Sequence, residues 1–538
     1  MLRSLLAAAT LSLGSVALAG SAGATNLTLS MFVGTNTDAV TQTTINTWVG
    51  DSHSAPTWQD LIDPTNPTSG ALYAAYLDCN MASNTDCTLR ETVATSLVGN
   101  TWFFQKVPKG KIEGDLAETY GCLMGDTVTY TCAADGYTIG SMTAADAQHA
   151  TYDLTNASSE VVSDLSAGPS QWGAYSRVVI NFTQLKATYT IRASSGGPIT
   201  TDAATNLNIV GRGTGNTVIT GDGNTNAFVQ DNGTGNPNSL YLQDITFRDF
   251  VDTHDGSVIY ATGNATTTLR NVIFVDNSST RYGTVYSNGT LNVTGGYFDN
   301  NSAARGGAIY ARGGNGVTIT GVRFSGNTAD SGDGGAVYIR DTGFLVSNSS
   351  FDDNFANNYS DGSALYVDEA TGSIHNTTVV HNSSTEYGAI AIFGSTVELL
   401  NDTIVGNQAL GGAAGLQLNS NDTVTMGSTL LLSNTTAGAQ ANCSTFASPN
   451  VFTSLGGNVV TKGTAGGCRF GSHDKMVSKY ALGKLGFNGG SVQTVPLIAK
   501  SVGTAFAPRA TCLATDARGV SRGHTGTCDA GAYQVTKK

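Results

Sequence analysis

A loose repeat of about 26 residues runs through the second half of the chain and restricts the possible folds more than any other feature. Seven segments place an apolar residue three positions before an asparagine, and successive asparagines are separated by 24, 26, 27, 28, 25 and 27 residues. The asparagines are Asn277, Asn301, Asn327, Asn354, Asn382, Asn407 and Asn434. The apolar residues are Phe274, Phe298, Phe324, Phe351, Val379, Ile404 and Leu431. Repeats at a period of this size predict a solenoid, a propeller or an array.

The residues between the asparagines decide among these architectures. A second column consists of a Gly-rich segment ending in tyrosine, at Tyr260, Tyr286, Tyr310, Tyr338 and Tyr366. No repeat holds the long 3.6-period stretches of a helical solenoid, and each repeat is too short for a four-stranded propeller blade. Two or three short strands separated by Gly, Asn or Asp turns fit each repeat. We therefore predict an all-β fold, a parallel β-helix in which successive coils are stacked about 4.8 Å apart.

The asparagine column has a structural explanation. At a tight turn, asparagine tolerates the left-handed backbone conformation and bonds to its own backbone, and stacked side-chain amides can bond to one another along the axis. We expect all seven asparagines to have this structural role.

The first 24 residues resemble a secretory signal peptide, because Arg3 is followed by an apolar run and by small residues up to Ala24. A membrane anchor is the alternative, but the run is short and rich in Ala and Ser. We predict an N-terminal cap region with an inserted module at 25–174, the coils at 175–440, and the last coils with a C-terminal cap at 441–538. Both ends need covers because bare coils are exposed sheet edges. The chain is expected to be exported, and to be extracellular or at the cell surface, with the periplasm as the alternative.

Charge and cysteine content agree with an exported chain. The net charge of −13 argues against a nucleic-acid partner and would repel a polyuronate unless metal ions intervene. No later segment is long and apolar enough to span a bilayer. Eight cysteines allow 105 pairings, and pairing of sequence neighbours is the simplest expectation. The neighbours are Cys79 and Cys87, Cys122 and Cys132, Cys443 and Cys468, and Cys512 and Cys528.

Three groups of motifs resemble those of a known group of proteins. "DCTLRETV" at 86–93 is similar to the N-terminal Cys-Ser-Leu-Arg-Glu-Ala motif of exported bacterial β-helix proteins. "SLGGNVV" at 454–460, "LGFNGGSVQTVPLI" and "DARGVSRGHTGTCDAGAYQV" resemble a C-terminal choice-of-anchor Q domain. The central "GGAIY" and "FSGN" repeats resemble polymorphic outer-membrane protein repeats. The resemblance implies a right-handed parallel β-helix of the pectin-lyase-like type, displayed at a bacterial surface or released, in a group where some members are suspected adhesins.

Charged residues five positions before the tyrosine column are the candidate functional residues. They are Asp255, Arg281, Arg305, Asp333 and Asp361, followed by Glu386 in the next repeat. Stacked carboxylates repel one another, and a Ca²⁺ ion bound by Asp333, Asp361 and Glu386 would remove that repulsion. With Arg281 or Arg305 as the base, this set would resemble the site of a β-helix polysaccharide lyase. The alternative is a polar turn in which Asp caps the backbone and Arg305 pairs with Asp333.

Three functions remain open from the sequence. The first is adhesion without catalysis, with a polysaccharide or a host or cell-surface ligand as the partner. The second is a calcium-dependent polysaccharide lyase or a glycosidase, and the third is a structural spacer or matrix component. Exposed aromatic side chains would favour glycan binding, and Trp102, Phe103, Phe104 and Trp172 are the first candidates.

Overall fold

The computed structural model divides into two units. It describes residues 28–33, 122–124, 130–132, 137–138, 177–182, 186–192, 198–200, 206–230, 239–263, 265–446, 449–463, 466–498, 501–523 and 526–536. The first unit comprises 1–219 and 237–243, and the second comprises 220–236 and 244–538. The expected signal peptide, Cys79, Cys87 and the four aromatic candidates at 102–104 and 172 lie outside the described residues.

The first unit contains a parallel ladder and a small antiparallel sheet. β1 (Thr28–Val33), β5 (Arg177–Phe182), β8 (Asn206–Val210) and β11 (Ser239–Gln243) pair in parallel in that order. β2 (Cys122–Met124), β3 (Tyr130–Cys132) and β4 (Tyr137–Thr138) are antiparallel, and Cys122 and Cys132 are register partners. β6 (Ala187–Arg192) and β7 (Ile199–Thr200) also belong to this unit, and β9 (Thr217–Asp222) crosses its boundary.

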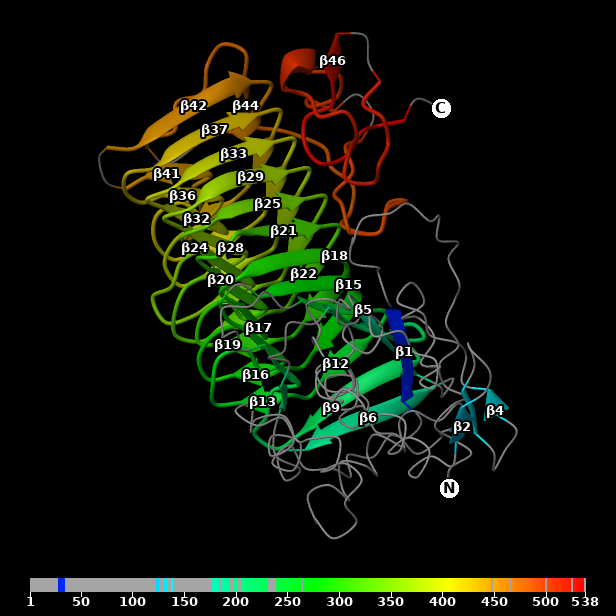
Figure 1. Ribbon diagram of the computed structural model, residues 1–538. Coiled ribbons are helices and arrows are strands. Elements are labelled where there is room, and N and C mark those ends of the chain that lie inside the picture. The colour runs from blue at the N-terminus through cyan, green and yellow to red at the C-terminus, as the bar shows by residue number, and fades with distance from the viewer. Residues whose placement is uncertain are drawn as a thin grey trace. The chain divides into compact units, whose positions relative to one another are not determined.

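The second unit is a parallel β-helix whose strands form three ladders, here called sheets 1, 2 and 3 (Figure 1). Each coil passes from sheet 1 to sheet 3, then to sheet 2, and returns to sheet 1 in the next coil. Equivalent residues of successive coils are register partners, as Phe298, Phe324 and Phe351 are. The prediction of an all-β parallel β-helix is confirmed.

Sheet 1 is the broad ladder and is bent in the middle of most coils. Its strands in this unit are β12 (Thr246–Arg248), β15 (Thr266–Val275), β18 (Thr290–Asp299), β21 (Gly316–Thr320), β22 (Arg323–Ser325), β25 (Gly343–Ser347), β26 (Ser350–Asp352), β29 (Thr371–His375), β30 (Thr378–Val380), β33 (Thr396–Leu400), β34 (Thr403–Val405), β37 (Thr423–Gly427), β38 (Leu430–Leu432), β42 (Val451–Gly456), β43 (Val459–Thr461) and β44 (Lys475–Val477). At the bend, a residue with positive φ, such as Asn348 or Asn376, separates the two strands that one coil contributes to sheet 1.

Sheets 2 and 3 are narrower. Sheet 2 runs through β10 (Phe228–Gln230), β14 (Ile259–Ala261), β17 (Val285–Ser287), β20 (Ile309–Arg312), β24 (Val337–Arg340), β28 (Leu365–Asp368), β32 (Ile390–Phe393), β36 (Leu416–Leu418) and β41 (Cys443–Thr445). Sheet 3 runs through β13 (Val251–Asp252), β16 (Ser278–Ser279), β19 (Ser302–Ala303), β23 (Thr328–Ala329), β27 (Phe355–Ala356), β31 (Ser383–Ser384), β35 (Gln408–Ala409), β39 (Thr435–Thr436) and β40 (Ala439–Gln440). Only β39 and β40 pair antiparallel within this ladder.

A column of phenylalanine rings fills the interior behind sheet 1. From Phe247 to Phe351, successive ring centroids are 5.6, 4.5, 5.1 and 4.6 Å apart, and neighbouring rings are stacked. These side chains are at most 1 % exposed, and Val379, Ile404 and Leu431 continue the column. Burial of one such ring contributes roughly 1.5–3 kcal/mol, so this column accounts for much of the cohesion between coils.

The seven asparagines of the sequence repeat form a hydrogen-bonded ladder at the corner between sheets 1 and 3. The side chain of Asn327 is typical. Its Oδ1 accepts the backbone N–H of Asn301 at 3.1 Å, and its Nδ2 donates to the carbonyl oxygen of Phe298 at 3.0 Å. The same Nδ2 also donates to Oδ1 of Asn354 at 2.9 Å. Every ladder asparagine is at most 1 % exposed, so these bonds satisfy backbone groups that no water reaches.

The stacked amides bond to one another along the axis, as expected, but the left-handed backbone that we expected at the ladder asparagines needs correction. The left-handed residue is the one before each ladder asparagine, as at Asp276, Asn300, Asp353 and His381, whose φ values lie between 54° and 59°. The ladder asparagines themselves do not have positive φ. The asparagine is therefore required because its short amide reaches across to the neighbouring coils.

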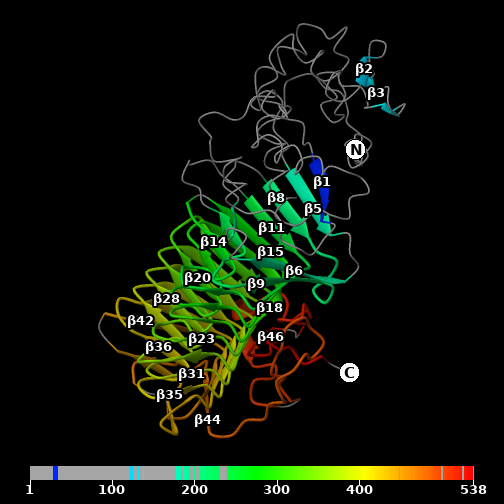
Figure 2. The ribbon, with the colours of Figure 1, turned by 90° about the horizontal axis from the view of Figure 1, so that it is seen from below.

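The chain after β44 returns along the outside of sheet 1 (Figures 1 and 2). The backbone N–H of Leu513 donates to Oδ1 of Asn401 at 2.8 Å, and the N–H of Ala532 donates to Oγ1 of Thr403 at 2.9 Å. This segment, 501–536, contains the 3₁₀ turn η3 (Arg509–Thr511) and the two-stranded sheet of β45 (Ala507–Pro508) and β46 (Thr527–Cys528).

A buried arginine holds this C-terminal segment together and ties it to the coils. Arg522 is 1 % exposed and donates to the carbonyl oxygens of Thr515, Asp529 and Gly531. It also donates to Oδ1 of Asn376 at 2.7 Å. Two disulfides lie in the C-terminal part of the chain. Cys512–Cys528 links two positions within the segment 501–536, and Cys443–Cys468 joins the last strand of sheet 2 to the loop after β43. Both are among the four neighbour pairs expected.

Replacing Asn354 by Ala should lower the free energy of unfolding by roughly 2–4 kcal/mol. The substitution leaves the buried N–H of Asn327 and the carbonyl oxygen of Phe324 without their partners, and each unsatisfied group costs roughly 1–3 kcal/mol. Urea denaturation followed by circular dichroism measures the change. Asn315→Ala, at an exposed position, is the control and should change stability by less than about 0.5 kcal/mol.

Replacing Arg522 by Leu should release the C-terminal segment from the coils. Four acceptors lose their donor, and the segment should become sensitive to limited proteolysis while the coils stay folded. Cleavage is followed by mass spectrometry, with Arg469→Leu as the exposed control. Equal protection of residues 501–536 in both variants would contradict the assigned role of Arg522.

Candidate functional site

The outer face of sheet 2 carries a column of stacked tyrosines. In β24, Val337 and Ile339 lie in the interior, so Tyr338 between them points outward. Tyr260, Tyr286, Tyr310, Tyr338 and Tyr366 are register partners, with successive ring centroids 5.2, 5.7, 4.8 and 5.0 Å apart. The column ends at Ala391, and the next positions are Gln417 and Ser444.

The tyrosines in this column have a structural role. Tyr286, Tyr310, Tyr338 and Tyr366 are at most 8 % exposed, and the hydroxyl of Tyr338 donates to Oδ2 of Asp368 at 2.7 Å. Burial raises the pKa of Tyr286 to about 12 and that of Tyr338 further, so these hydroxyls stay protonated. Stacked rings this well covered cannot serve as an exposed sugar-binding surface.

The charged residues singled out by sequence lie in the turn that precedes sheet 2. In two of the six coils, the stacked position is one residue later than the sequence repeat predicted. The backbone N–H groups of the following glycines donate to the carbonyl oxygens of the next coil: Gly256 to Tyr282, Gly306 to Asp333, Gly334 to Asp361, and Gly362 to Tyr387. The stacked column is therefore Asp255, Tyr282, Arg305, Asp333, Asp361 and Tyr387. Arg281 and Glu386 each precede a column position, so a charge does not stand at the same place in all six coils.

The two arginines have separate surroundings. Nε of Arg281 lies 3.3 Å from Oδ1 of Asp255, and its guanidinium lies 5.5 Å from the ring centre of Tyr282. The positive charge of Arg305 favours the ionised form of Asp333, although burial dominates and raises the pKa of that carboxyl. The arrangement does not bring Arg281 to the acidic residues Asp333 and Asp361.

The two aspartates in this column accept backbone N–H groups from the next coil. Oδ1 of Asp333 accepts the N–H of Asp361 at 3.0 Å, and Oδ1 of Asp361 accepts the N–H of Tyr387 at 3.0 Å. The second oxygen of Asp361 accepts Nδ2 of Asn419, two coils further on, at 3.3 Å. Burial, followed by the negative charges of Asp333 and Glu386, raises the pKa of Asp361 to about 7.

Asp333, Asp361 and Glu386 are not gathered into one set of metal ligands. Within the described residues, no three His, Cys, Asp or Glu side chains lie so that they could hold a metal ion. Asp333 and Asp361 each use one carboxylate oxygen on the backbone of the next coil, as a capping aspartate does. A calcium role for these residues remains a proposal.

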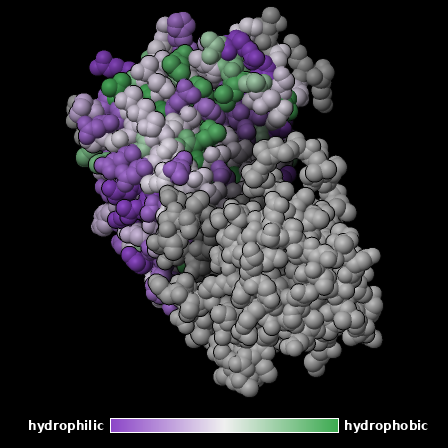
Figure 3. Space-filling view, viewed as in Figure 1, coloured by the Kyte–Doolittle hydropathy of each residue, from purple (hydrophilic) through white to green (hydrophobic). Residues whose placement is uncertain are grey.

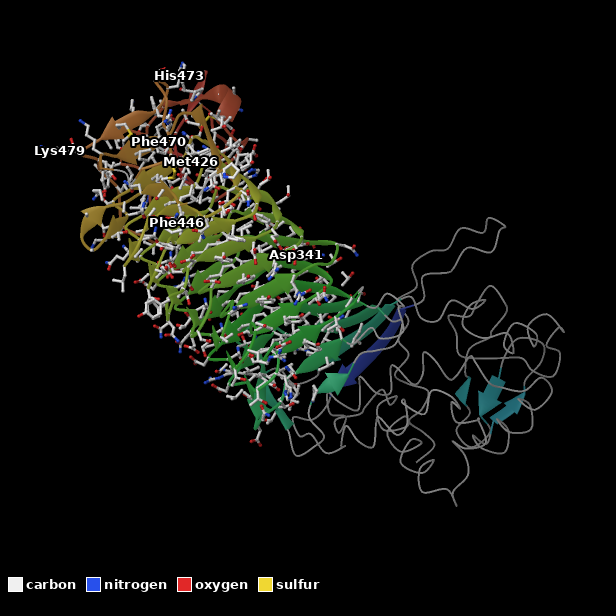
Figure 4. All side chains as sticks on the ribbon, turned by 90° about the vertical axis from the view of Figure 1, so that its left-hand side faces the viewer. Asp341, Met426, Phe446, Phe470, His473 and Lys479 are labelled. Carbon is white, nitrogen blue, oxygen red and sulfur yellow. A yellow bond between two sulfur atoms is a disulfide. The ribbon has the colours of Figure 1, made fainter. Side chains whose placement is uncertain are left out.

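Aromatic side chains are exposed where the tyrosine column ends. Phe446 follows β41 and is 71 % exposed, and Phe393 at the end of β32 is 39 % exposed. The ring of Tyr387 lies 5.8 Å from the ring of Phe446, centre to centre. Figure 4 shows Phe446 on the C-terminal coils and Asp341 on an earlier coil. We call the group Asp361, Glu386, Tyr387, Asn419 and Phe446 the terminal patch.

Two glycines leave room for the ring of Tyr387 in the terminal patch. A Cβ atom at Gly412 would stand 2.4 Å from Cδ1 of Tyr387, and one at Gly411 would stand 2.9 Å from Cε1. Only glycine at these positions lets the ring lie on the turn. In the space-filling view, hydrophobic residues gather in separate areas of the upper, C-terminal part, between hydrophilic ones (Figure 3).

Sequence reasoning missed Tyr387, Asn419 and Phe446. The available signal was the interruption of the tyrosine column at Ala391, which changes the outer face of sheet 2 in the last coils. Among the described residues, no helix has the length and apolarity needed to cross a membrane.

Two short segments match a known repeat. Residues 295–312 and 321–340 match the Chlamydia polymorphic membrane protein repeat. These segments include β19, β20, β22, β23, β24 and the second half of β18, so the matched motif corresponds to coils of the β-helix. Comparison with curated proteins and with solved structures gave no match. The resemblance to polymorphic outer-membrane protein repeats is supported for the coils.

Replacing Asp361 by Asn should remove a pH dependence of stability. An unfolded aspartate ionises near pH 4, whereas Asp361 keeps its proton up to about pH 7 in the folded chain. Its contribution to the free energy of unfolding therefore falls as pH rises from about 4 to about 7, and is then constant. The variant should be more stable than the parent by roughly 1–3 kcal/mol at about pH 8, and equally stable at about pH 4.

Urea denaturation over this pH range measures the difference. Asp353→Asn, which changes an exposed carboxylate outside the patch, should leave the parent pH profile unchanged. The same profile in Asp361→Asn as in the parent would contradict the raised pKa.

Proposed function

We propose that the chain is an exported bacterial surface protein that binds glycans through the terminal patch, without catalysis. The match to polymorphic membrane protein repeats supports a surface location, because these repeats carry that name and occur here in the coils. A stack of coils suits display, since it holds its outer faces in fixed positions along its length.

The observation that carries the proposal is the chemistry of the terminal patch. Phe446 offers an exposed ring face of the kind on which sugar rings stack. Asp361 and Asn419 are hydrogen-bonded to each other at 3.3 Å, and the remaining lone pairs of the carboxyl and the second N–H of the amide can bond sugar hydroxyls. Aromatic contact beside a few polar groups is the usual composition of a small-molecule site.

A second candidate is a glycosidase or a polysaccharide lyase. The specific observation in its favour is Asp361, whose pKa of about 7 suits a general acid or base near neutral pH. The contacts of the two aspartates with backbone N–H groups favour binding over catalysis, because a catalytic pair must keep both carboxylates directed at the substrate. A structural spacer is the third candidate, and it predicts neither binding nor turnover.

The test applies the chain to immobilised neutral, amino and acidic polysaccharides, with calcium and with chelator. We expect retention on at least one glycan without new reducing ends or unsaturated products. Phe446→Ala should weaken retention about tenfold, a loss of roughly 1.4 kcal/mol. Phe487→Ala is the matched control, since Phe487 is 61 % exposed in the C-terminal part of the chain, outside the terminal patch.

Each result separates the candidates. Turnover that disappears in Asp361→Asn would replace binding by catalysis as the function. Retention that is equal in Phe446→Ala and Phe487→Ala would remove the terminal patch from the proposal. Absence of both retention and turnover would leave the spacer.

A further inference from the structure

We infer that the terminal patch takes a glycan with free amino groups, that is, a polymer containing protonated hexosamine residues. This inference rests on the proposed function and adds the chemical class of the ligand. Three observations lead to it: the sign of the charge around Asp361, the rings of Phe446 and Tyr387 nearby, and the contacts that position Tyr387 and Asp361.

Negative charge dominates the surroundings of Asp361. Asp333 faces it from the preceding coil and Glu386 from the following coil, and both carboxylates disfavour its ionisation. Tyr366 on β28 and Tyr387 in the next turn are the neighbouring hydroxyl groups, and burial raises the pKa of both. Arg305 is one coil beyond Asp333 and acts mainly on that residue. A cation bound beside Asp361 and Glu386 would reduce the repulsion between the carboxylates.

The exposed rings restrict the kind of cation. The rings of the exposed Phe446 and the half-buried Tyr387 lie 5.8 Å apart, centre to centre, so an ammonium group on a sugar can contact one ring while the C–H face of the sugar stacks on the other. A bare metal ion would gain nothing from the rings. A uronic acid would place its carboxylate against three carboxylates and would be repelled.

Contacts within the chain position Tyr387, Asn419 and Asp361 before a ligand arrives. Tyr387 rests on Gly411 and Gly412, and the bond from Asn419 to Asp361 joins two turns that are 58 residues apart in sequence. A site that needs little ordering loses less affinity to conformational entropy when it binds. The features together fit an acidic and aromatic surface whose polar part is positioned in advance.

Binding should release protons. At a slightly acid pH the amine is charged and Asp361 is largely protonated. A bound ammonium favours the ionised carboxylate, so Asp361 gives up its proton when the ligand binds. This linkage distinguishes a contact at Asp361 from a general attraction to the acidic protein.

The experiment compares chitosan oligosaccharides with the fully N-acetylated oligosaccharides of the same length by isothermal titration calorimetry. It is done in two buffers with different heats of ionisation, on the full mature chain. We expect the amine form to bind at least about tenfold more tightly and to release protons. Asp361→Asn should lose both the preference and the proton release while keeping weak binding of the acetylated form, and Asp353→Asn should behave as the parent does.

The outcomes separate this inference from the proposed function. Equal binding of amine and acetylated forms, lost in Phe446→Ala, would overturn the amine preference and leave glycan binding intact. Polylysine that binds as tightly as the amino glycan, with no effect of Phe446→Ala, would show a general acidic surface and overturn the inference. Glu386→Gln gives a second test if Asp361→Asn fails to fold, and unchanged affinity and proton release in that variant would count against the site.

Discussion

The bond between each ladder asparagine and the backbone of the neighbouring coils is the interaction on which the second unit depends. A coil that turns sharply from sheet 1 to sheet 3 leaves backbone N–H and carbonyl groups in the interior, where an unpaired group costs roughly 1–3 kcal/mol. Asn327 satisfies two backbone groups of the preceding coil, the N–H of Asn301 and the carbonyl oxygen of Phe298. Repetition of this bond allows the corner to be sharp, and the sharp corner brings the phenylalanine rings into one stack.

Other corners use the same principle with different side chains. Between sheets 2 and 1, Oγ of Ser395 accepts the N–H of Ala370, and Oδ1 of Asp422 accepts the N–H of Ser395. At the bend within sheet 1, Oδ1 of Asp402 accepts the N–H of Thr377. Burial raises the pKa of both aspartates, which identifies them as groups held for their hydrogen bonds and not for exposed charge. Asp333 and Asp361 belong to this pattern, and Asp361 differs because its second oxygen reaches Asn419 beside exposed rings.

The repeat in the sequence was sufficient to predict the coils, because one residue in each coil fills the core and one satisfies the corner. Phe324 and Asn327 occupy the positions that their spacing indicates. The register of the charged turn was less predictable. Coils differ in length, and part of the difference lies in this turn. Alignment of the repeats on Tyr286 and Tyr366 therefore made Arg281 the equivalent of Asp361, whereas in the structure the equivalent residue is Tyr282. No local pattern indicated that residues 501–536 return along sheet 1, since contacts such as Arg522 with Asn376 join positions 146 residues apart. The terminal patch was hidden for the same reason: Asp361, Tyr387 and Phe446 come from three different coils.

The asparagine ladder has a direction. Each Oδ1 accepts the backbone N–H of the ladder asparagine in the preceding coil. The N–H of every ladder asparagine therefore has its acceptor in the following coil. At the N-terminal end the position is held by Phe250, which needs only to donate its N–H to Asn277. At the other end Asn442, only 8 residues after Asn434 and in the same coil, supplies the last acceptor. Each coil therefore completes the hydrogen bonds of the coil before it, and a coil could be inserted or removed within the column without changing either end of the ladder.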